Sequence, residues 1–231
     1  MQTLMHYRLC PFSRAIRIAL AELAIEVDEI EEKPWEWRPE FLAINPAGEL
    51  PVLELAEDRL ICGVYAIAEY LADAIAEHPV YGGTVPLFPG DNEQRAEVRR
   101  LVDWFNVKLD REVMRELLAE KLYARVSGTP ARSPDLELLR ALKTNLRYHM
   151  SYIGYLADHR RWLAGDEMSF ADIAAAAHLS CADYLGAVPC DEHANAKVWY
   201  ARMKSRPSFR SILADRVPGI APPPHYADLD F

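Results

Sequence analysis

The sequence predicts two domains of different class, an α/β domain followed by an all-α domain. Three observations lead to this prediction. Short strand-like and helix-like stretches alternate over residues 1–77. Residues 78–91 contain three prolines and three glycines, a composition typical of a linker. Over residues 92–216 the apolar residues recur only at helical spacing, which indicates a second domain without strands.

The first domain reads as strand, helix, strand, loop, hairpin and helix. The predicted strands cover residues 3–7, 25–30, 51–55 and 60–62. A helix is expected after Pro11, because apolar residues there follow the i, i+3, i+4, i+7 spacing of one buried face: Ile16, Ala19, Leu20 and Leu23. Asn45-Pro46-Ala47-Gly48 has the composition of a turn.

The second domain begins with two long amphipathic helices. The first is expected to run from about Val98 towards Val126, where Ser127-Gly128-Thr129-Pro130 breaks the chain. The second follows an apolar stripe from Leu139 to Ile153. Ser169-Phe170-Ala171-Asp172 resembles a capping box, which predicts the start of a core helix and a structural role for Asp172.

Composition and charge exclude several classes of function. The net charge of −9 argues against nucleic-acid binding and against attachment to anionic lipid, both of which need a basic face. We see no apolar run long enough for membrane insertion and no secretory signal. Four scattered cysteines do not form a disulfide framework, and no common metal-ligand spacing is present. We therefore expect a cytoplasmic protein without a metal.

Several segments, in this order and spacing, resemble the glutathione transferase family. They are Pro46 to Leu53, Ala66 to Leu71, Leu87-Phe88-Pro89 and Ser169 to Asp172. The resemblance implies a thioredoxin-like N-terminal domain, a helical C-terminal domain and a homodimer. It also implies a cis peptide bond before Pro51, with the backbone of Leu50 and Val52 clasping glutathione.

Cys10 stands where transferases of this fold place an activating residue. Cys10-Pro11-Phe12-Ser13 resembles the signature of omega-type and glutaredoxin-like enzymes. The positive end of a helix dipole favours a thiolate, and Arg8 and Arg14 are expected to add to this effect. The alternative interpretation is that Cys10 is a small apolar filler at the domain interface.

The next helix start lacks the polar pair that the resemblance leads us to expect. In the family an acidic residue and a serine hold the two charged ends of the γ-glutamyl group. Gly63 and Val64 occupy those positions here, and neither side chain forms hydrogen bonds. Each missing polar contact costs about 1–3 kcal/mol. We therefore interpret the glutathione site as degraded.

The prolines predict an extended tail over residues 217–231, because three successive prolines cannot lie inside a helix. This tail could serve a function other than catalysis. Behind Pro222-Pro223-Pro224 it ends in Tyr226-Ala227-Asp228-Leu229-Asp230-Phe231, the composition of a short recognition segment. The alternative is that Leu229 and Phe231 fold back onto the helical domain. This ending, on a transferase-like body without the acid-serine pair, resembles a group of alphaproteobacterial division proteins that bind FtsZ.

That second resemblance implies further contact residues. Asp228 and its neighbours would bind FtsZ, together with the long-helix surface around Arg115 and Glu120. Trp35 and Trp37 either anchor a partner or pack under the cis-proline loop.

Two functional hypotheses follow. The first is a non-catalytic, dimeric protein that binds FtsZ at the division site and needs no cofactor. The alternative is a glutathione transferase or thioltransferase that uses Cys10, with glutathione as its ligand.

Overall fold

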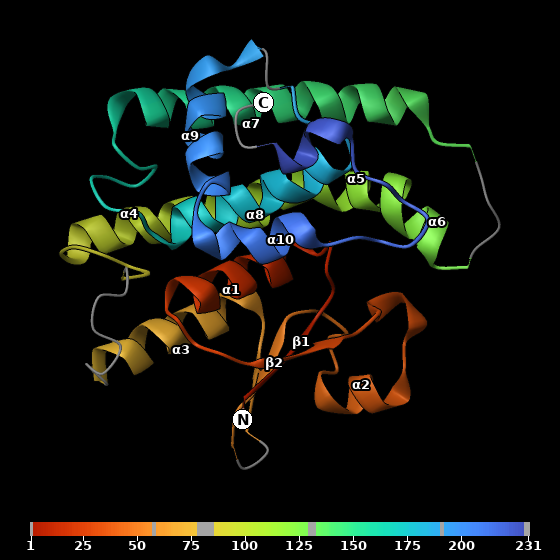
Figure 1. The fold of residues 1–231 in the computed structure, drawn as a ribbon, viewed down its shortest axis with the longest axis horizontal. Coiled ribbons are helices and arrows are strands. Elements are labelled where there is room, and N and C mark those ends of the chain that lie inside the picture. Colours follow the sequence, from red (N-terminus) through yellow and green to blue (C-terminus); the bar gives the residue numbers. More distant parts are fainter. Residues whose placement is uncertain (1, 57–58, 78–85, 129–132, 190–191, 229–231) are drawn as a thin grey trace.

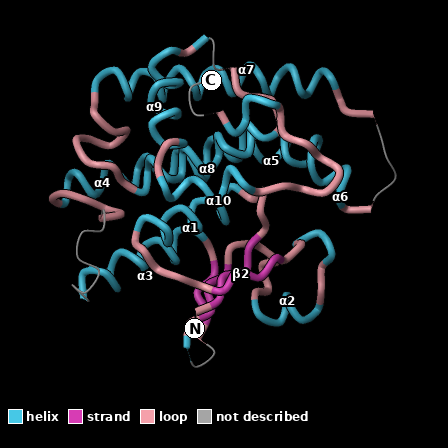
Figure 2. The backbone as a smooth tube through the Cα atoms, in the orientation of Figure 1, coloured by secondary structure: helices cyan, strands magenta, loops and turns pink. Residues whose placement is uncertain are grey.

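The computed structural model describes residues 2–56, 59–77, 86–128, 133–189 and 192–228 (Figure 1). The N-terminal domain holds all the strands of this part of the chain, and helices make up the C-terminal domain (Figure 2). The predicted order of an α/β domain before an all-α domain is therefore confirmed. Residues 78–85 of the predicted linker lie outside the described residues.

The N-terminal domain is a four-stranded mixed sheet with three helices. Its elements are β1 (Thr3–His6), α1 (Pro11–Glu22), β2 (Asp28–Glu31), α2 (Pro39–Ile44), β3 (Val52–Glu54), β4 (Leu60–Cys62) and α3 (Val64–Glu77). The strand order is β2-β1-β3-β4, with β1 parallel to β2 and the other pairs antiparallel. All four predicted strands are present, although β2 begins at Asp28, three residues later than expected.

The first long helix runs without interruption from Asn92 to Val126, but it is not uniformly α-helical. It comprises α4 (Asn92–Asp103), a π-helical segment (Trp104–Met114), α5 (Arg115–Leu118), a second π-helical segment (Ala119–Tyr123) and α6 (Ala124–Val126). Asp91 begins it with a capping box, in which its carboxylate accepts hydrogen bonds from Glu93 N and Gln94 N, each at 3.0 Å. π-Helical segments are rare and frequent at functional sites.

The remaining helices enclose a buried centre. They are α7 (Leu136–His159), α8 (Phe170–Tyr184), α9 (Ala194–Lys204) and α10 (Arg210–Ala214). Every residue of α8 is buried, and α1 of the N-terminal domain packs against it. Figure 1 shows α7 on one side of α8, with α1, α10 and the sheet on the other. No helix within the described ranges has the length and apolarity to cross a membrane.

The predicted capping box at Ser169 is confirmed, and Asp172 has the predicted structural role. The Asp172 carboxylate is fully buried. It accepts hydrogen bonds from Ser169 N at 3.1 Å, Leu163 N at 3.0 Å and Trp199 Nε1 at 2.9 Å. It thereby joins the start of α8 to the preceding loop and to α9.

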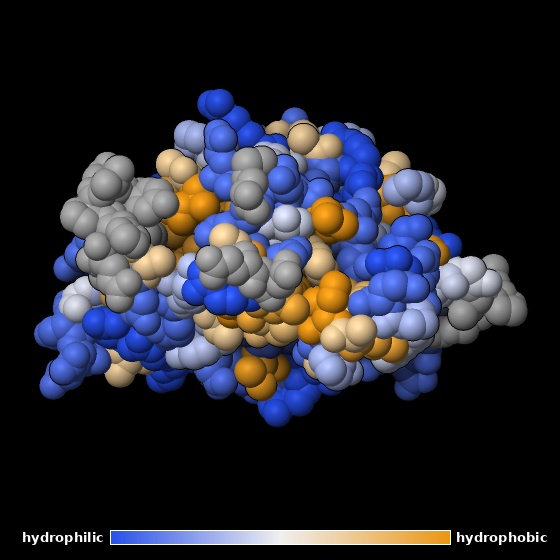
Figure 3. Space-filling model, turned by 90° about the horizontal axis from the view of Figure 1, so that it is seen from below, coloured by the Kyte–Doolittle hydropathy of each residue, from blue (hydrophilic) through white to orange (hydrophobic). Residues whose placement is uncertain are grey.

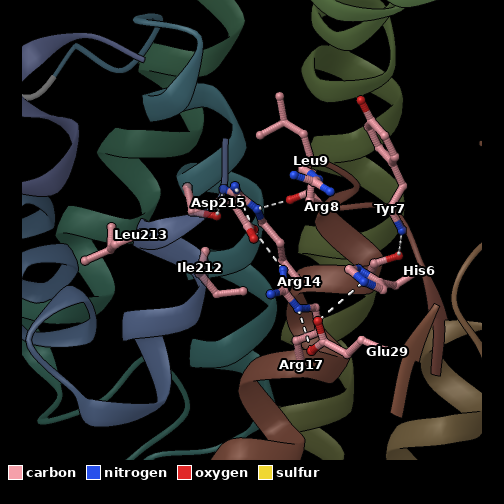
Figure 4. Close-up of polar contacts among 12 residues, drawn as sticks. His6, Tyr7, Arg8, Leu9, Arg14, Arg17, Glu29, Ile212, Leu213 and Asp215 are labelled. Carbon is pink, nitrogen blue, oxygen red and sulfur yellow. Dashed lines mark hydrogen bonds and ion pairs between the residues drawn. The ribbon is translucent and has the colours of Figure 1, made fainter. Parts of the chain in front are cut away.

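A buried ionic cluster fastens α1 to the C-terminal part of the chain. Figure 4 shows Arg14 and Arg17 of α1 gathered with Asp215 and Glu29. Arg17 donates to Asp215 Oδ2 at 2.8 Å and to Glu29 Oε1 at 2.9 Å. Arg14 is fully buried and donates to the same Asp215 oxygen at 3.4 Å. Two arginines therefore share the Asp215 carboxylate at the domain interface, and Glu29 provides a second carboxylate for Arg17.

Arg14 also holds the tail. Its Nη1 donates to Ser180 Oγ at 2.9 Å and to the Tyr226 hydroxyl at 3.2 Å. Tyr226 is fully buried, packs edge-on against Tyr184 with ring centroids 5.1 Å apart, and donates to Ile212 O at 3.1 Å. The extended tail expected from the prolines is therefore wrong for Pro224–Ala227, which form a 3₁₀ turn around this anchor.

Stability at this interface is expected to fall on acidification. Burial, and secondarily the Arg17 guanidinium, lowers the pKa of His6 from 6.5 to about 4. The unfolded chain takes up a proton near the higher value and the folded chain only near the lower one. The free energy of unfolding therefore decreases as the pH falls from 6.5 towards 4. The contribution approaches about 1.4 kcal/mol per pH unit.

Urea unfolding at about pH 7 and about pH 5 measures this slope. His6→Gln should flatten it, because glutamine does not titrate. His159→Gln serves as the control, since His159 is exposed. Equal slopes for the parent and His6→Gln would contradict the assignment.

Candidate functional site

A hollow with a volume of about 530 Å³ lies between the two domains. Tyr7, Cys10 and Phe12 line it from the start of α1 and the loop before it. Residues 48–50 line it from the loop before β3. The long helix contributes the opposite wall: Asn106, Val107, Asp110, Arg111, Arg115, Leu118 and Tyr123. Most of this wall comes from the two π-helical segments.

Cys10 is the N-cap residue of α1, as the sequence predicts, but it is only 9% exposed. Burial raises the pKa of its thiol, and hydrogen bonds from Ser13 and Phe12 oppose this only in part. The predicted help from nearby arginines is wrong. Arg8 pairs with Glu31 and donates to Arg216 O at 2.7 Å, while Arg14 is bound to the tail anchor. The environment therefore favours a neutral thiol.

Of the two residues that flank the cis-proline, one lines the pocket and the other belongs to the sheet. The Leu50–Pro51 bond is cis, and Leu50 lines the pocket. Val52 is fully buried in β3, where it pairs with Met5 on one side and Cys62 on the other. Its backbone therefore belongs to the sheet, and Leu50 alone of the predicted pair faces the pocket.

At the start of α3, neither Gly63 nor Val64 has a side chain that can hold a charged ligand group. Gly63 precedes the helix with φ +92°, and its N–H donates to Pro51 O at 3.0 Å. A side chain added there would meet open space, but the backbone conformation is one that L-residues rarely adopt. Val64 is the first residue of α3. The polar anchors missing from the sequence are not supplied at this helix start.

The two tryptophans after β2 have different environments. Trp35 packs edge-on against Tyr7, with ring centroids 4.8 Å apart, and lies 5.4 Å from the Tyr123 ring across the pocket. Trp35 therefore packs against two of the residues that line the hollow. Trp37 is 65% exposed and has φ +49°, with its ring close to Gly48. It rests on the cis-proline loop and remains open to solvent.

Two domain profiles match the chain. The first is described as the N-terminal domain of glutathione S-transferase and matches residues 9–74. The second is described as the C-terminal domain of glutathione S-transferase and matches residues 123–207. The chain belongs to the glutathione S-transferase family. The predicted glutathione transferase fold is thereby confirmed.

Similar members of the glutathione S-transferase family carry different names. FtsZ-localized protein A of Caulobacter vibrioides is 47% identical over 233 residues, covering 100% of this chain and 98% of that protein. A crystal structure of a glutathione S-transferase from Rhodospirillum rubrum F11 has a TM-score of 0.92, 46% identity and full coverage of both chains. The structure of FzlA from C. crescentus has a TM-score of 0.90 and 47% identity, covering 100% and 99% of the two chains.

The long helix places the two predicted contact residues in different environments. Arg115 is exposed and donates to the buried carboxylate of Asp110 at 3.3 Å. Glu120 is only 6% exposed and accepts a hydrogen bond from Asp135 N at 3.1 Å. Burial makes Glu120 unsuited to direct contact with a partner, and its carboxylate instead supports the loop before α7.

The tail presents Asp228 directly after its anchor. Asp228 is exposed, and its N–H donates to His225 O at 3.0 Å at the end of the 3₁₀ turn. Tyr226, two residues earlier, fixes this position. The sequence did not single out Tyr226 as the anchor, although a lone tyrosine behind three prolines was a signal for one. Leu229 and Phe231 lie outside the described residues.

The N-terminal domain exposes several large apolar side chains: Ile30, Trp37, Leu60 and Tyr65. Figure 3, which views the molecule from below, shows apolar surface near the middle of that face. Within the described ranges, no group of three or more His, Cys, Asp or Glu side chains is arranged to hold a metal ion.

Proposed function

We propose that this chain is a non-catalytic member of the glutathione S-transferase family that binds FtsZ and acts in cell division. The observation that carries the proposal is the 47% identity to FtsZ-localized protein A over the whole chain. The match includes the tail, which lies beyond both transferase domain profiles. We further propose that the protein is a cytoplasmic homodimer that acts at the division site and needs no cofactor.

The residues of the interdomain pocket favour a function other than the transferase reaction with glutathione. An acidic residue and a serine would bind the amino and carboxylate groups of a γ-glutamyl ligand, but Gly63 and Val64 stand at these positions. The buried Cys10 thiol has a raised pKa, which lowers its nucleophilicity at neutral pH. Among the described residues, the usual acid-serine pair is therefore missing, and the Cys10 thiol is not activated.

The surface supports contact with a protein partner. Trp37 offers a large aromatic side chain in a fixed loop, and aromatic residues of this kind dominate interface energetics. Arg115 and Asp228 offer exposed charges of opposite sign. Because the buried Tyr226 anchors the chain two residues earlier, Asp228 loses little conformational freedom on binding.

Reversing the charge at Asp228 is expected to weaken binding to FtsZ filaments. Asp228→Lys places a cation where the partner is complementary to a carboxylate, and we expect affinity to fall about tenfold or more. Sedimentation of the variant with polymerised FtsZ, over a range of FtsZ concentrations, measures this.

Asp166→Lys is the matched control, because Asp166 is an exposed acid in the loop before α8 and its reversal makes the same change in net charge. Equal sedimentation of Asp228→Lys and the parent would remove Asp228 from the interface. A parent protein that does not sediment with FtsZ would contradict the proposed function itself.

Restoring the polar pair tests the proposed loss of the glutathione site. Gly63→Glu combined with Val64→Ser is expected to delay the protein on glutathione resin, whereas the parent should pass through. The glutamate must adopt a positive φ, so we expect a stability cost of about 1–2 kcal/mol. Val64→Ser alone is the control that avoids this strain. Strong retention of the parent, with Cys10-dependent thiol transfer, would instead support the transferase alternative.

A further inference from the structure

The C-terminal domain has a second hollow of about 310 Å³, which shares no lining residue with the interdomain pocket. It lies between the long helix, the first half of α7 and the loop after α8. Its apolar lining comes from these three elements: Val113, Leu117, Leu136, Leu139, Leu142, Leu146, Ala187 and Val188. Leu136 is 64% exposed at one end, so the groove continues to the surface.

The rim of this groove is positively charged. Arg140 and Lys143 are exposed on neighbouring turns of α7. Lys121 stands on the long helix and donates to Leu185 O at 3.0 Å. The described residues that line the groove include no Asp or Glu. A local excess of positive charge is notable in a chain whose net charge is −9.

The two exposed cations are available to a ligand. Among the described residues, neither Arg140 nor Lys143 takes part in an ion pair, whereas the half-buried Arg147 on the same helix pairs with Glu192 at 2.6 Å. The Glu192 carboxylate interacts with Lys143 only at longer range. A carboxylate that approaches the rim would therefore not have to displace an existing partner. Electrostatic complementarity of this kind selects the partner and speeds association.

We propose that this groove binds an acidic peptide segment with apolar side chains, supplied by a protein partner. The apolar floor accepts leucine-like or aromatic side chains, while Arg140 and Lys143 pair with flanking carboxylates. From Leu136 to Leu146 the helix rises about 15 Å, the length of four to five extended residues. The length of the groove therefore suits a short segment of a partner protein. The site is separate from Asp228 and does not depend on the identity of the partner proposed above.

The test uses synthetic fluorescent peptides of about eight residues. The probe alternates aspartate with leucine and phenylalanine. One comparison peptide has asparagine in place of aspartate, and another has serine in place of the apolar residues. Fluorescence anisotropy against the full-length protein is expected to show saturable binding of the probe, with at least about tenfold weaker binding of both comparison peptides.

Charge reversal locates the site. Arg140→Glu with Lys143→Glu is expected to weaken probe binding by about tenfold or more. The matched control is Arg161→Glu with Arg210→Glu, which alters two exposed arginines elsewhere by the same total charge. Circular dichroism confirms folding of both variants. The control should bind the probe within about twofold of the parent.

Several results would overturn the proposal. If both double variants bound the probe equally weakly, the loss would be due to the change in net charge and not to the groove. Equal affinity for the serine peptide would exclude the apolar floor. No binding of the probe by the parent would reject the groove as a peptide site. Normal sedimentation with FtsZ alongside any of these results would leave the proposed function standing, which separates the two hypotheses.

Discussion

Replacing Arg14 with methionine is expected to lower the free energy of unfolding by about 3 kcal/mol. The guanidinium is fully buried. Its removal leaves the Tyr226 hydroxyl and Arg8 O without the hydrogen bonds that Arg14 donates to them. Asp215 keeps Arg17 at 2.8 Å, which limits the loss to the lower end of the range for broken buried ion pairs. Urea denaturation followed by circular dichroism measures the change.

Arg161→Met is the control for this substitution, because Arg161 is exposed. It should change the free energy of unfolding by less than about 0.5 kcal/mol. Arg14→Lys keeps the charge but has one donor group where the guanidinium uses three nitrogens, so we expect an intermediate loss. A loss for Arg14→Met no greater than that for Arg161→Met would show that the buried cluster does not stabilise the fold.

Replacing Asp172 with alanine is expected to cost about 3–5 kcal/mol, the second large effect. The substitution leaves four buried donors without their acceptor: Leu163 N, Ser169 N, Ser169 Oγ and Trp199 Nε1. It also removes the capping box of the fully buried helix α8. For a chain of this length the loss corresponds to a decrease in Tm of about 10 °C.

Thermal unfolding of Asp172→Ala beside Asp166→Ala checks this prediction. Asp166 is exposed in the same loop region, so its replacement should leave Tm nearly unchanged. Asp172→Asn retains one acceptor and should lie between the two. If Asp172→Ala lowered Tm no more than Asp166→Ala does, the hydrogen bonds of the buried carboxylate would only offset the cost of its desolvation.

The sequence was sufficient for the order and class of nearly every element. Alternation and turn residues marked the four strands, and the motif Ser169 to Asp172 marked the start of the core helix. These features are local, since each depends on residues only a few positions apart. The start of the first long helix was six residues earlier than expected, at Asn92 rather than Val98. There the capping box at Asp91, not the apolar stripe, determines the start of the helix.

Long-range contacts of polar residues were not predictable. Arg14 was expected to support a thiolate at Cys10, but it turns away to Ser180 and Tyr226. Glu120 was expected at the surface, but it is buried against the loop before α7. A charged residue on a helix is exposed in most proteins, and only the tertiary structure shows when it is paired and buried.

The π-helical segments were also invisible in the sequence. The apolar spacing between Trp104 and Tyr123 fits an ordinary α-helix closely enough to be read as one. The residues of this helix that line the interdomain pocket still follow the spacing of a single helical face: Val107, Asp110, Arg111, Arg115 and Leu118. The spacing of the side chains therefore gave no sign of the π-helical turns.

The partners of Arg14 determine when, during synthesis of the chain, the protein can finish folding. Ser180, Asp215 and Tyr226 lie 166, 201 and 212 residues after it in the chain. The ribosome delivers the N-terminal domain first, and domains generally begin to fold as they emerge. Until the last residues are made, however, the Arg14 guanidinium has only the Arg8 carbonyl among these hydrogen-bond partners. The first domain to be synthesised therefore reaches its final packing only when translation of the whole chain is almost complete.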